Sequence, residues 1–361
     1  MASTQFEFNV MMFGGKRTGK TSVLAAMQEC FEEKFKGVGL TITPDDDNTK
    51  KLMEKKRNEM NGYFKNSSEL FECKDSPTLD KAVHSFKIQI KNKKNGVIRL
   101  NFLDYPGEWI NSNTHYSELA EEARKAHIII VAIDTPYLIE QSSSEYTTIG
   151  KYNEKRNFPD SLYKLLKENF KLGSEYPKKM VLFVPLKCEK YFHAWKLSVV
   201  NNLIQSAYKN VFSYLGTENG KYCESVILPI ITLGEVDFHS FKKNSSGSIE
   251  LNKSGLPTTE IYKIRNKMAN KAEPLYCEKP AAHVLMYILF QAKESKREEG
   301  NTLSKLCKRF KNFFQEKFLK MPTAGEFIKI NEASLTYIKI LLAIPNALIS
   351  RRYQMMMCLN L

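Results

Sequence analysis

A glycine- and lysine-rich segment near the N-terminus has the residue types and the spacing of a phosphate-binding loop. The segment GGKRTGKT, residues 14–21, fits the pattern GxxxxGK[ST] in full. Glycines let backbone N–H groups curl around phosphate oxygens, and a helix that begins at the loop turns its positive end toward them. We expect Lys20 to contact the β- and γ-phosphates and the Thr21 hydroxyl to bind Mg²⁺. The residues expected around the phosphates are Gly14, Gly15, Lys16, Arg17, Thr18, Gly19, Lys20, Thr21 and Ser22.

A carboxylate suited to the same metal ion ends the apolar segment IRLNFLD at Asp104. It would hold Mg²⁺ through water. The residues from Asp104 to Gly107 form a DxxG, and the backbone N–H of Gly107 would reach the γ-phosphate, so this loop can respond to the presence of that phosphate. The alternative is an ordinary aspartate before a Pro-Gly turn, and the nearby phosphate-binding pattern counts against it.

Short apolar segments predict the strands that position these residues, and they lie at 6–13, 98–104, 127–134, 179–186 and 225–233. Helical patterns between most of them favour the α/β class, with a mostly parallel sheet and helices on both faces. Residues 85–104 carry two alternating halves around KNKKNG, whose Asn-Gly predicts a hairpin and one antiparallel edge strand. We expect a P-loop NTPase domain over 1–295, with insertions at about 42–77 and 238–272, and a basic helical extension over 296–361.

The segments GGKRTGKT and DYPG, with the hairpin that leads into the aspartate strand, resemble the Ras-like (TRAFAC-type) P-loop GTPases. That resemblance implies a threonine, upstream of the hairpin, that closes over Mg²⁺ and the γ-phosphate. The matching residue is Thr78, and Thr41, Thr43 and Thr49 are the alternatives because residues 42–77 are long for such a loop.

The same resemblance implies GTP as the nucleotide, together with Mg²⁺. The segment LKCE, residues 186–189, stands where the family carries its N/TKxD motif. Lys187 can lie over the base plane, and Glu189 can accept the N1–H and N2–H of guanine, a pair of donors that adenine lacks. Thr232 and Leu233 stand where the family has its S/TA(K/L) loop, whose backbone touches the base. A surface Lys-Cys-Glu turn is the alternative reading of LKCE.

More narrowly, the segments DYPGEW, AIDTPYLIE, PLKCEKY, ITLGE and CEKPAAHVLMYIL resemble bacterial GTPases of the YcjX-like and double-GTPase type. Several of those proteins are encoded near stress or conflict systems. The resemblance covers about residues 6–235. It implies a GTP-dependent molecular switch with slow hydrolysis, which acts in a bacterial stress or defence system.

The residues that would support hydrolysis depart from the Ras-like pattern. Glu108 follows the DxxG where those enzymes carry a glutamine, and a carboxylate there would be repelled by the γ-phosphate unless protonated or turned away. Arg17 stands at the position of the arginine in the YRTGKS-like loops of guanylate-binding proteins, where that arginine acts in cis as an arginine finger. Arg17 is therefore the candidate to stabilise the charge of the transition state, and Lys16 is a weaker alternative. A scaffold that binds nucleotide without turnover and an ATPase remain as alternative functions.

The formal net charge is +14, and residues 301–361 carry ten Lys or Arg against three Glu. Residues 302–320 predict a helix with an aromatic face and a cationic flank, suited either to a membrane surface or to packing on the chain's own domain. We expect a nucleotide and a protein effector as partners, with peripheral membrane contact or a homo-oligomer as further options, and no nucleic acid. Scattered cysteines without a CxxC pair, and no signal peptide, favour the cytoplasm.

Overall fold

The computed structural model describes residues 5–35, 40–65, 69–72, 81–90, 97–140, 149–169, 179–216 and 223–294. The chain divides into two units, 1–287 and 288–361, and the second is described only over residues 288–294. Both Thr78 and the helix expected over 302–320 lie outside the described residues. Among the described residues, no helix has the length and apolar character needed to cross a membrane.

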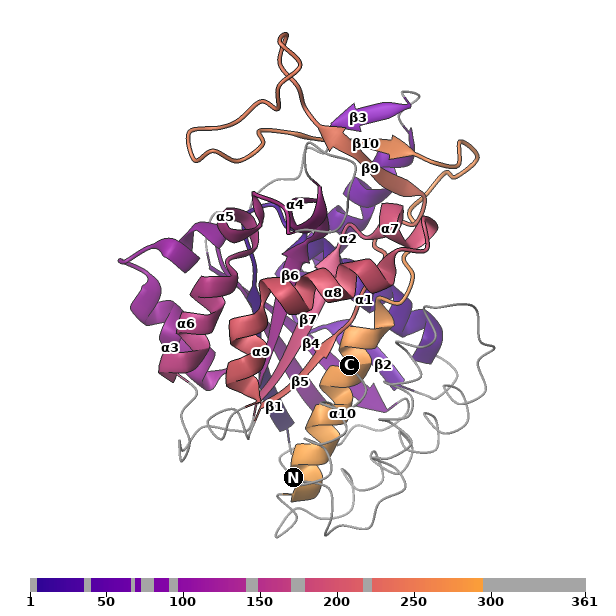
Figure 1. The fold of residues 1–361 in the computed structure, drawn as a ribbon. Coiled ribbons are helices and arrows are strands. Elements are labelled where there is room, and N and C mark those ends of the chain that lie inside the picture. The colour runs from indigo at the N-terminus through magenta and orange to yellow at the C-terminus, as the bar shows by residue number, and fades with distance from the viewer. Residues whose placement is uncertain are drawn as a thin grey trace. The chain divides into compact units, whose positions relative to one another are not determined.

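A seven-stranded sheet with the order β2-β4-β5-β1-β6-β7-β8 forms the centre of the first unit (Figure 1). Its strands β5, β1, β6, β7 and β8 are parallel, and β4 is antiparallel to both of its neighbours. Every residue of β6 and β7 is buried, so both faces of the sheet are covered there. The strands are β1 (Gln5–Phe13), β2 (Leu40–Pro44), β4 (Ala82–Ile90), β5 (Val97–Asp104), β6 (Ile128–Asp134), β7 (Lys179–Leu186) and β8 (Cys223–Ile227).

The expected mainly parallel sheet with one antiparallel strand and the hairpin before Asp104 are therefore confirmed. The structure differs in two details. The antiparallel strand β4 lies one place in from the edge, because β2 pairs outside it, and the strand expected over 225–233 is instead Cys223–Ile227. The helices are α1 (Lys20–Phe35), α2 (Asp47–Gly62), α3 (Tyr116–Lys125), α4 (Thr135–Ile139), α5 (Asn153–Asn157), α6 (Pro159–Asn169), α7 (Glu189–His193), α8 (Leu197–Ala207), α9 (Lys209–Leu215) and α10 (Glu278–Glu294), with the 3₁₀ turns η2 (Tyr63–Lys65) and η3 (Gly107–Asn111).

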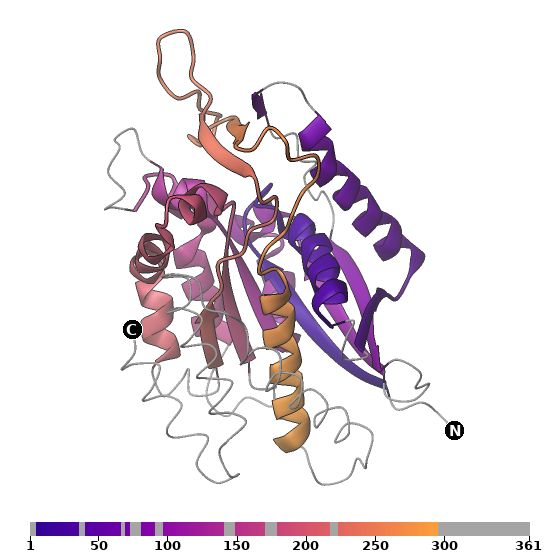
Figure 2. The same ribbon diagram turned by 90° about the vertical axis from the view of Figure 1, so that its right-hand side faces the viewer.

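The two stretches expected as insertions meet in a small antiparallel sheet. Its strand order is β3-β10-β9, with β3 (Leu70–Glu72), β10 (Glu260–Ile264) and β9 (Val236–Phe241). Strands β9 and β10 lie beyond the carboxyl ends of the central parallel strands in both views (Figures 1 and 2). Parallel α/β sheets bind ligands at that edge, so the insertions reach the edge where the site is expected.

Candidate functional site

The segment 14–21 is a tight loop between the end of β1 and the start of α1. Gly14 and Gly19 have φ of 154° and 102°, a region that favours glycine. A Cβ on Gly14 would lie 2.8 Å from the carbonyl oxygen of Ala132, and one on Gly15 would lie 2.5 Å from that of Arg156. Thr18 Oγ1 donates to the Gly15 carbonyl at 2.6 Å. The backbone is thus held in a curled form that only glycine permits at these positions.

Lys20, Thr21 and Asp104 converge at the carboxyl ends of two adjacent strands. Residue 104 is paired in register with Met12 of β1, which brings β5 to the loop. Thr21 Oγ1 donates to Asp104 Oδ2 at 2.8 Å, and Lys20 Nζ lies 3.8 Å from Asp104 Oδ1. Hydroxyl and carboxylate oxygens are the ligands that Mg²⁺ prefers, so these donors fit the metal ion.

The Lys20 ammonium is buried within the loop. It donates to the carbonyl oxygens of Gly14 at 3.0 Å and Gly15 at 3.2 Å. Burial lowers the pKa of Lys20, and the neighbouring Asp104 opposes that shift. The charge is therefore held among carbonyl and carboxylate oxygens at the mouth of the loop.

The DxxG segment packs directly on the phosphate-binding loop. A Cβ on Gly107 would lie only 2.1 Å from the backbone nitrogen of Lys16, so a side chain at residue 107 is excluded. Glu108 forms an ion pair with Lys16. Burial acts to raise the pKa of Glu108, but the hydrogen bond from Lys16, a backbone hydrogen bond and the charges of Lys16 and Lys20 together outweigh it, and the pKa is lowered. The carboxylate is thus ionised and turned toward a cation.

The two segments expected to read the base also lie together. Glu189 is 2% exposed, and its Oε1 accepts hydrogen bonds from the backbone nitrogens of Thr232 and Leu233, both at 2.9 Å. Burial raises the pKa of Glu189 while these donors oppose the shift. The structure therefore joins the LKCE segment to the loop that follows β8.

Comparison with known proteins identifies the fold that these segments build. A family model described as Double-GTPase 2 matches residues 9–219. The chain belongs to the Double-GTPase 2 family. It is a P-loop GTPase of the double-GTPase type, and the family indicates a guanine-nucleotide-binding protein. A search of curated proteins returns no match.

Solved structures that resemble this Double-GTPase 2 protein include a GTPase-like domain and an elongation factor. The GTPase-like domain of S. cerevisiae Ski7, bound to GDP and inorganic phosphate, is 15% identical with a TM-score of 0.32, over 63% of this chain and 43% of that chain. A bacterial selenocysteine-specific elongation factor, EF-Sec, is 13% identical with a TM-score of 0.28, over 63% of this chain and 26% of that chain. The chain thus spans less than half the length of either.

A cavity in the Double-GTPase 2 fold brings the expected loops together. It is lined by Thr18, Gly19 and Ser22 from the N-terminal loop and by the four residues expected at the base, Lys187, Glu189, Thr232 and Leu233. The cavity also has an aromatic part that the sequence did not reveal. There Phe71 of β3 stacks on Tyr63 with ring centroids 5.2 Å apart, and on Tyr262 of β10 at 6.1 Å.

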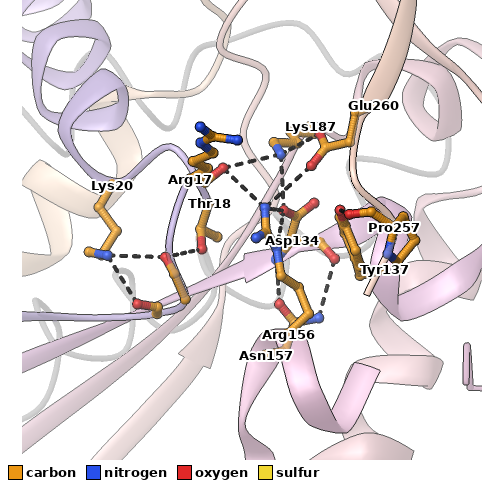
Figure 3. Close-up of polar contacts among 12 residues, drawn as sticks. Arg17, Thr18, Lys20, Asp134, Tyr137, Arg156, Asn157, Lys187, Pro257 and Glu260 are labelled. Atoms are coloured by element: carbon orange, nitrogen blue, oxygen red, sulfur yellow. Dashed lines mark hydrogen bonds and ion pairs between the residues drawn. The ribbon is translucent and has the colours of Figure 1, made fainter. Parts of the chain in front are cut away.

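Lys187 is held by oxygens from three separate segments (Figure 3). Its ammonium lies 2.6 Å from Glu260 Oε2, 2.9 Å from Asp134 Oδ2 and 3.4 Å from the carbonyl oxygen of Arg17. Arg156 also donates to Asp134 Oδ2, from Nε at 2.9 Å and from Nη2 at 2.7 Å. Sequence reasoning missed Asp134, Arg156 and Glu260, and the only signal was that Asp134 ends the apolar segment HIIIVAID.

The remaining expected residues are placed as follows. The Arg17 side chain is exposed and makes no hydrogen bond or ion pair within the described residues. Thr41 and Thr43 lie on the edge strand β2, and Thr49 donates to Asp46 at the start of α2. None of these three hydroxyls hydrogen bonds to the phosphate-binding loop in the part of the chain that the structure describes, and Thr78 lies outside that part.

Proposed function

We propose that this chain binds GTP with Mg²⁺, hydrolyses it slowly and acts as a molecular switch. The observation that carries the proposal is the convergence of Lys20, Thr21 and Asp104 beside a DxxG loop whose Gly107 touches the backbone of Lys16. A glycine-lined loop, a buried ammonium and a hydroxyl–carboxylate pair are what a Mg²⁺-nucleotide requires.

Each residue has a distinct proposed role. Lys20 and the backbone of residues 14–20 would hold the phosphates, and Thr21 and Asp104 would hold Mg²⁺, with Thr78 as the candidate that completes the metal site. Bound Mg²⁺ neutralises charge that develops on the phosphate oxygens. Lys187 and Glu189 would read the base, with the backbone of Thr232 and Leu233 beside it. The carboxylate at Glu189 favours guanine over adenine and counts against an ATPase.

The residues beside the DxxG support slow turnover. Glu108 is paired with Lys16, so its charge is compensated, but an ionised carboxylate does not reproduce the neutral amide of a glutamine. We assign the charge-stabilising role to Arg17, whose exposed side chain is not committed to another described residue, with Lys16 as the weaker alternative. The rival function is a scaffold that binds GTP without turnover. The carboxylate of Glu108 in place of a glutamine favours it, and the available guanidinium of Arg17 counts against it.

The contact between Gly107 and the phosphate-binding loop supports the proposed switch role. A segment that packs on this loop in one nucleotide state must shift when the phosphate content changes. The η3 turn begins at Gly107 and includes Trp109, which stacks on His115 with ring centroids 4.1 Å apart. We propose this segment as the surface that signals to a protein effector, in a bacterial stress or defence system as the double-GTPase resemblance supports.

The Lys20→Ala variant tests the site. We expect its affinity for a fluorescent GTP analogue in Mg²⁺ to fall by at least about 100-fold, because the charge-assisted bonds to the phosphates are lost. The matched control is Lys125→Ala, which removes an ammonium from the surface of α3. Retained micromolar affinity in Lys20→Ala would contradict the assignment. Phosphate release by the wild-type protein then distinguishes the switch from the scaffold, and a preference for ATP would refute the reading of residues 186–189.

A further inference from the structure

Four charged side chains meet in the interior between the phosphate-binding loop and the small sheet (Figure 3). Asp134 ends β6, Arg156 lies on α5, Lys187 follows β7 and Glu260 begins β10. Two cations and two carboxylates make the cluster neutral, which is the condition under which charges are retained in a protein interior. Nη2 of Arg156 and Nζ of Lys187 also donate to the carbonyl oxygen of Arg17, at 3.3 and 3.4 Å, so the cluster is bonded to the loop itself.

Glu260 lies in a different part of the chain from the other three residues of the cluster. It lies outside residues 9–219, which the Double-GTPase 2 model matches, and it is carried by the strand that pairs with β3. Its Oε2 lies 2.6 Å from Lys187 Nζ and also accepts from the Tyr262 hydroxyl, and its Oε1 lies 3.3 Å from Arg156 Nη2. The small sheet therefore supplies a carboxylate to the lysine that is expected at the base.

The charge balance shows what Glu260 does for Lys187. Arg156 makes two hydrogen bonds to Asp134 Oδ2, the same oxygen that Lys187 contacts. Without Glu260, one carboxylate would face two closely spaced cations, and their mutual repulsion would favour an outward rotamer of the more flexible lysine. With Glu260 in place, the ammonium is fixed at three oxygens, and Lys187 lines the cavity.

We propose that Glu260 is a positioning residue for nucleotide recognition, which holds Lys187 so that its stem flanks the base of the bound nucleotide. This inference rests on the proposed function, because it assumes that a guanine nucleotide occupies the cavity. It assigns part of the protein's affinity for the nucleotide base to a segment that lies beyond residues 9–219, the range that the family model matches. Through β10, the inserted sheet then sets how tightly the base is held.

The test compares a ligand that has a base with one that has none. In Glu260→Gln we expect the affinity for a fluorescent GTP analogue to fall about tenfold, as for loss of a charge-assisted bond. The affinity for inorganic tripolyphosphate, measured by its displacement of that analogue, should stay unchanged because it reports only on the phosphate loop. A loss of affinity for both ligands would mean that Glu260 is merely structural, and no loss for either would equally overturn the inference.

Two further variants make the test specific. Glu72→Gln is the matched control, since it removes the same charge from β3 of the same sheet, where Glu72 pairs with the exposed Lys242. In a Lys187→Met background, Glu260→Gln should have no further effect on GTP affinity, and an additive loss would contradict the role assigned to Lys187.

The remaining controls cover misfolding and failure of the proposed function. If Glu260→Gln does not fold, Tyr262→Phe removes only the hydroxyl that donates to Glu260, and we expect GTP affinity to fall about threefold. Unchanged GTP affinity in that folded variant would refute the inference. A wild-type protein that binds no GTP would refute the proposed function and this inference together, whereas wild-type binding with an unaffected Glu260→Gln refutes the inference alone.

Discussion

The backbone and the side chain of Arg17 have different roles. Its φ is 58°, and its carbonyl oxygen accepts from Arg156 at 3.3 Å and from Lys187 at 3.4 Å. These bonds anchor the middle of the phosphate-binding loop. The guanidinium is exposed and is not needed for that anchor. Substitution of the side chain therefore leaves the loop's principal support in place.

We predict that Arg17→Ala binds GTP with nearly wild-type affinity but hydrolyses it about 10³-fold more slowly, because an arginine finger acts on charge that develops in the transition state. Single-turnover phosphate release and an analogue titration measure the two quantities separately. Arg17→Lys is the conservative control and should recover part of the rate, since it restores the charge without the planar fork. A rate of GTP hydrolysis in Arg17→Ala equal to that of the wild-type protein would contradict the assignment of Arg17 as an arginine finger.

The sequence allowed some of the candidate site to be predicted and concealed the rest. Residues 14–21 and the DxxG at Asp104 are contiguous patterns, in which spacing alone sets which atoms are expected to face the phosphates. Glu260 has no such signal, because its meeting with Lys187 depends on how two distant segments pack. Asp134 was visible only as the end of a strand, without its partner Arg156.

Helix α2 shows why one inserted element was not foreseen. Its buried positions are Thr49, Met53, Lys56 and Met60, so polar residues occupy part of the buried stripe and hide the helical period. Strand β3 has three residues, of which Phe71 alone is buried, and so short a strand carries no usable alternation. The long apolar strands β6 and β7, by contrast, were evident from the sequence.

The start of α2 offers a direct test of this element. Asp46 is the N-cap, and its carboxylate accepts from the backbone nitrogen of Thr49 at 2.8 Å and from its hydroxyl at 2.7 Å. We predict that Asp46→Ala lowers the free energy of unfolding by about 1 kcal/mol, as measured by urea denaturation. Asp47→Ala, in the first turn of the same helix, should lower it by only about 0.3 kcal/mol. Equal losses in the two variants would contradict the cap.

Acid should destabilise the chain through buried histidines. Burial lowers the pKa of His283 to about 4, with Lys279 adding to the shift, and burial likewise lowers that of His127 to about 4. Unfolding restores a value near 6.5. Between pH 6.5 and 4 the unfolded chain therefore binds protons that the folded chain excludes, so stability falls as the pH is lowered through that range.

We predict that the free energy of unfolding, measured in urea, falls less between pH 7 and pH 4 in His283→Gln than in the wild-type protein. The difference between the two losses should be on the order of 3 kcal/mol. His239→Gln serves as the control, because His239 is exposed on β9. A pH profile of His283→Gln that parallels the wild-type profile would show that this histidine does not contribute.

The pairing of β3 with β10 has a consequence for the order in which the chain folds during synthesis. Residues 70–72 leave the ribosome long before residues 260–264, and pairing across so long a separation must wait for loop closure over about two thirds of the first unit. The strands β1 and β4–β7 can assemble earlier from segments that are already present. A nascent chain would therefore contain its phosphate-binding loop before the aromatic part of the cavity exists, and the proposed nucleotide site would be complete only after translation has passed β10.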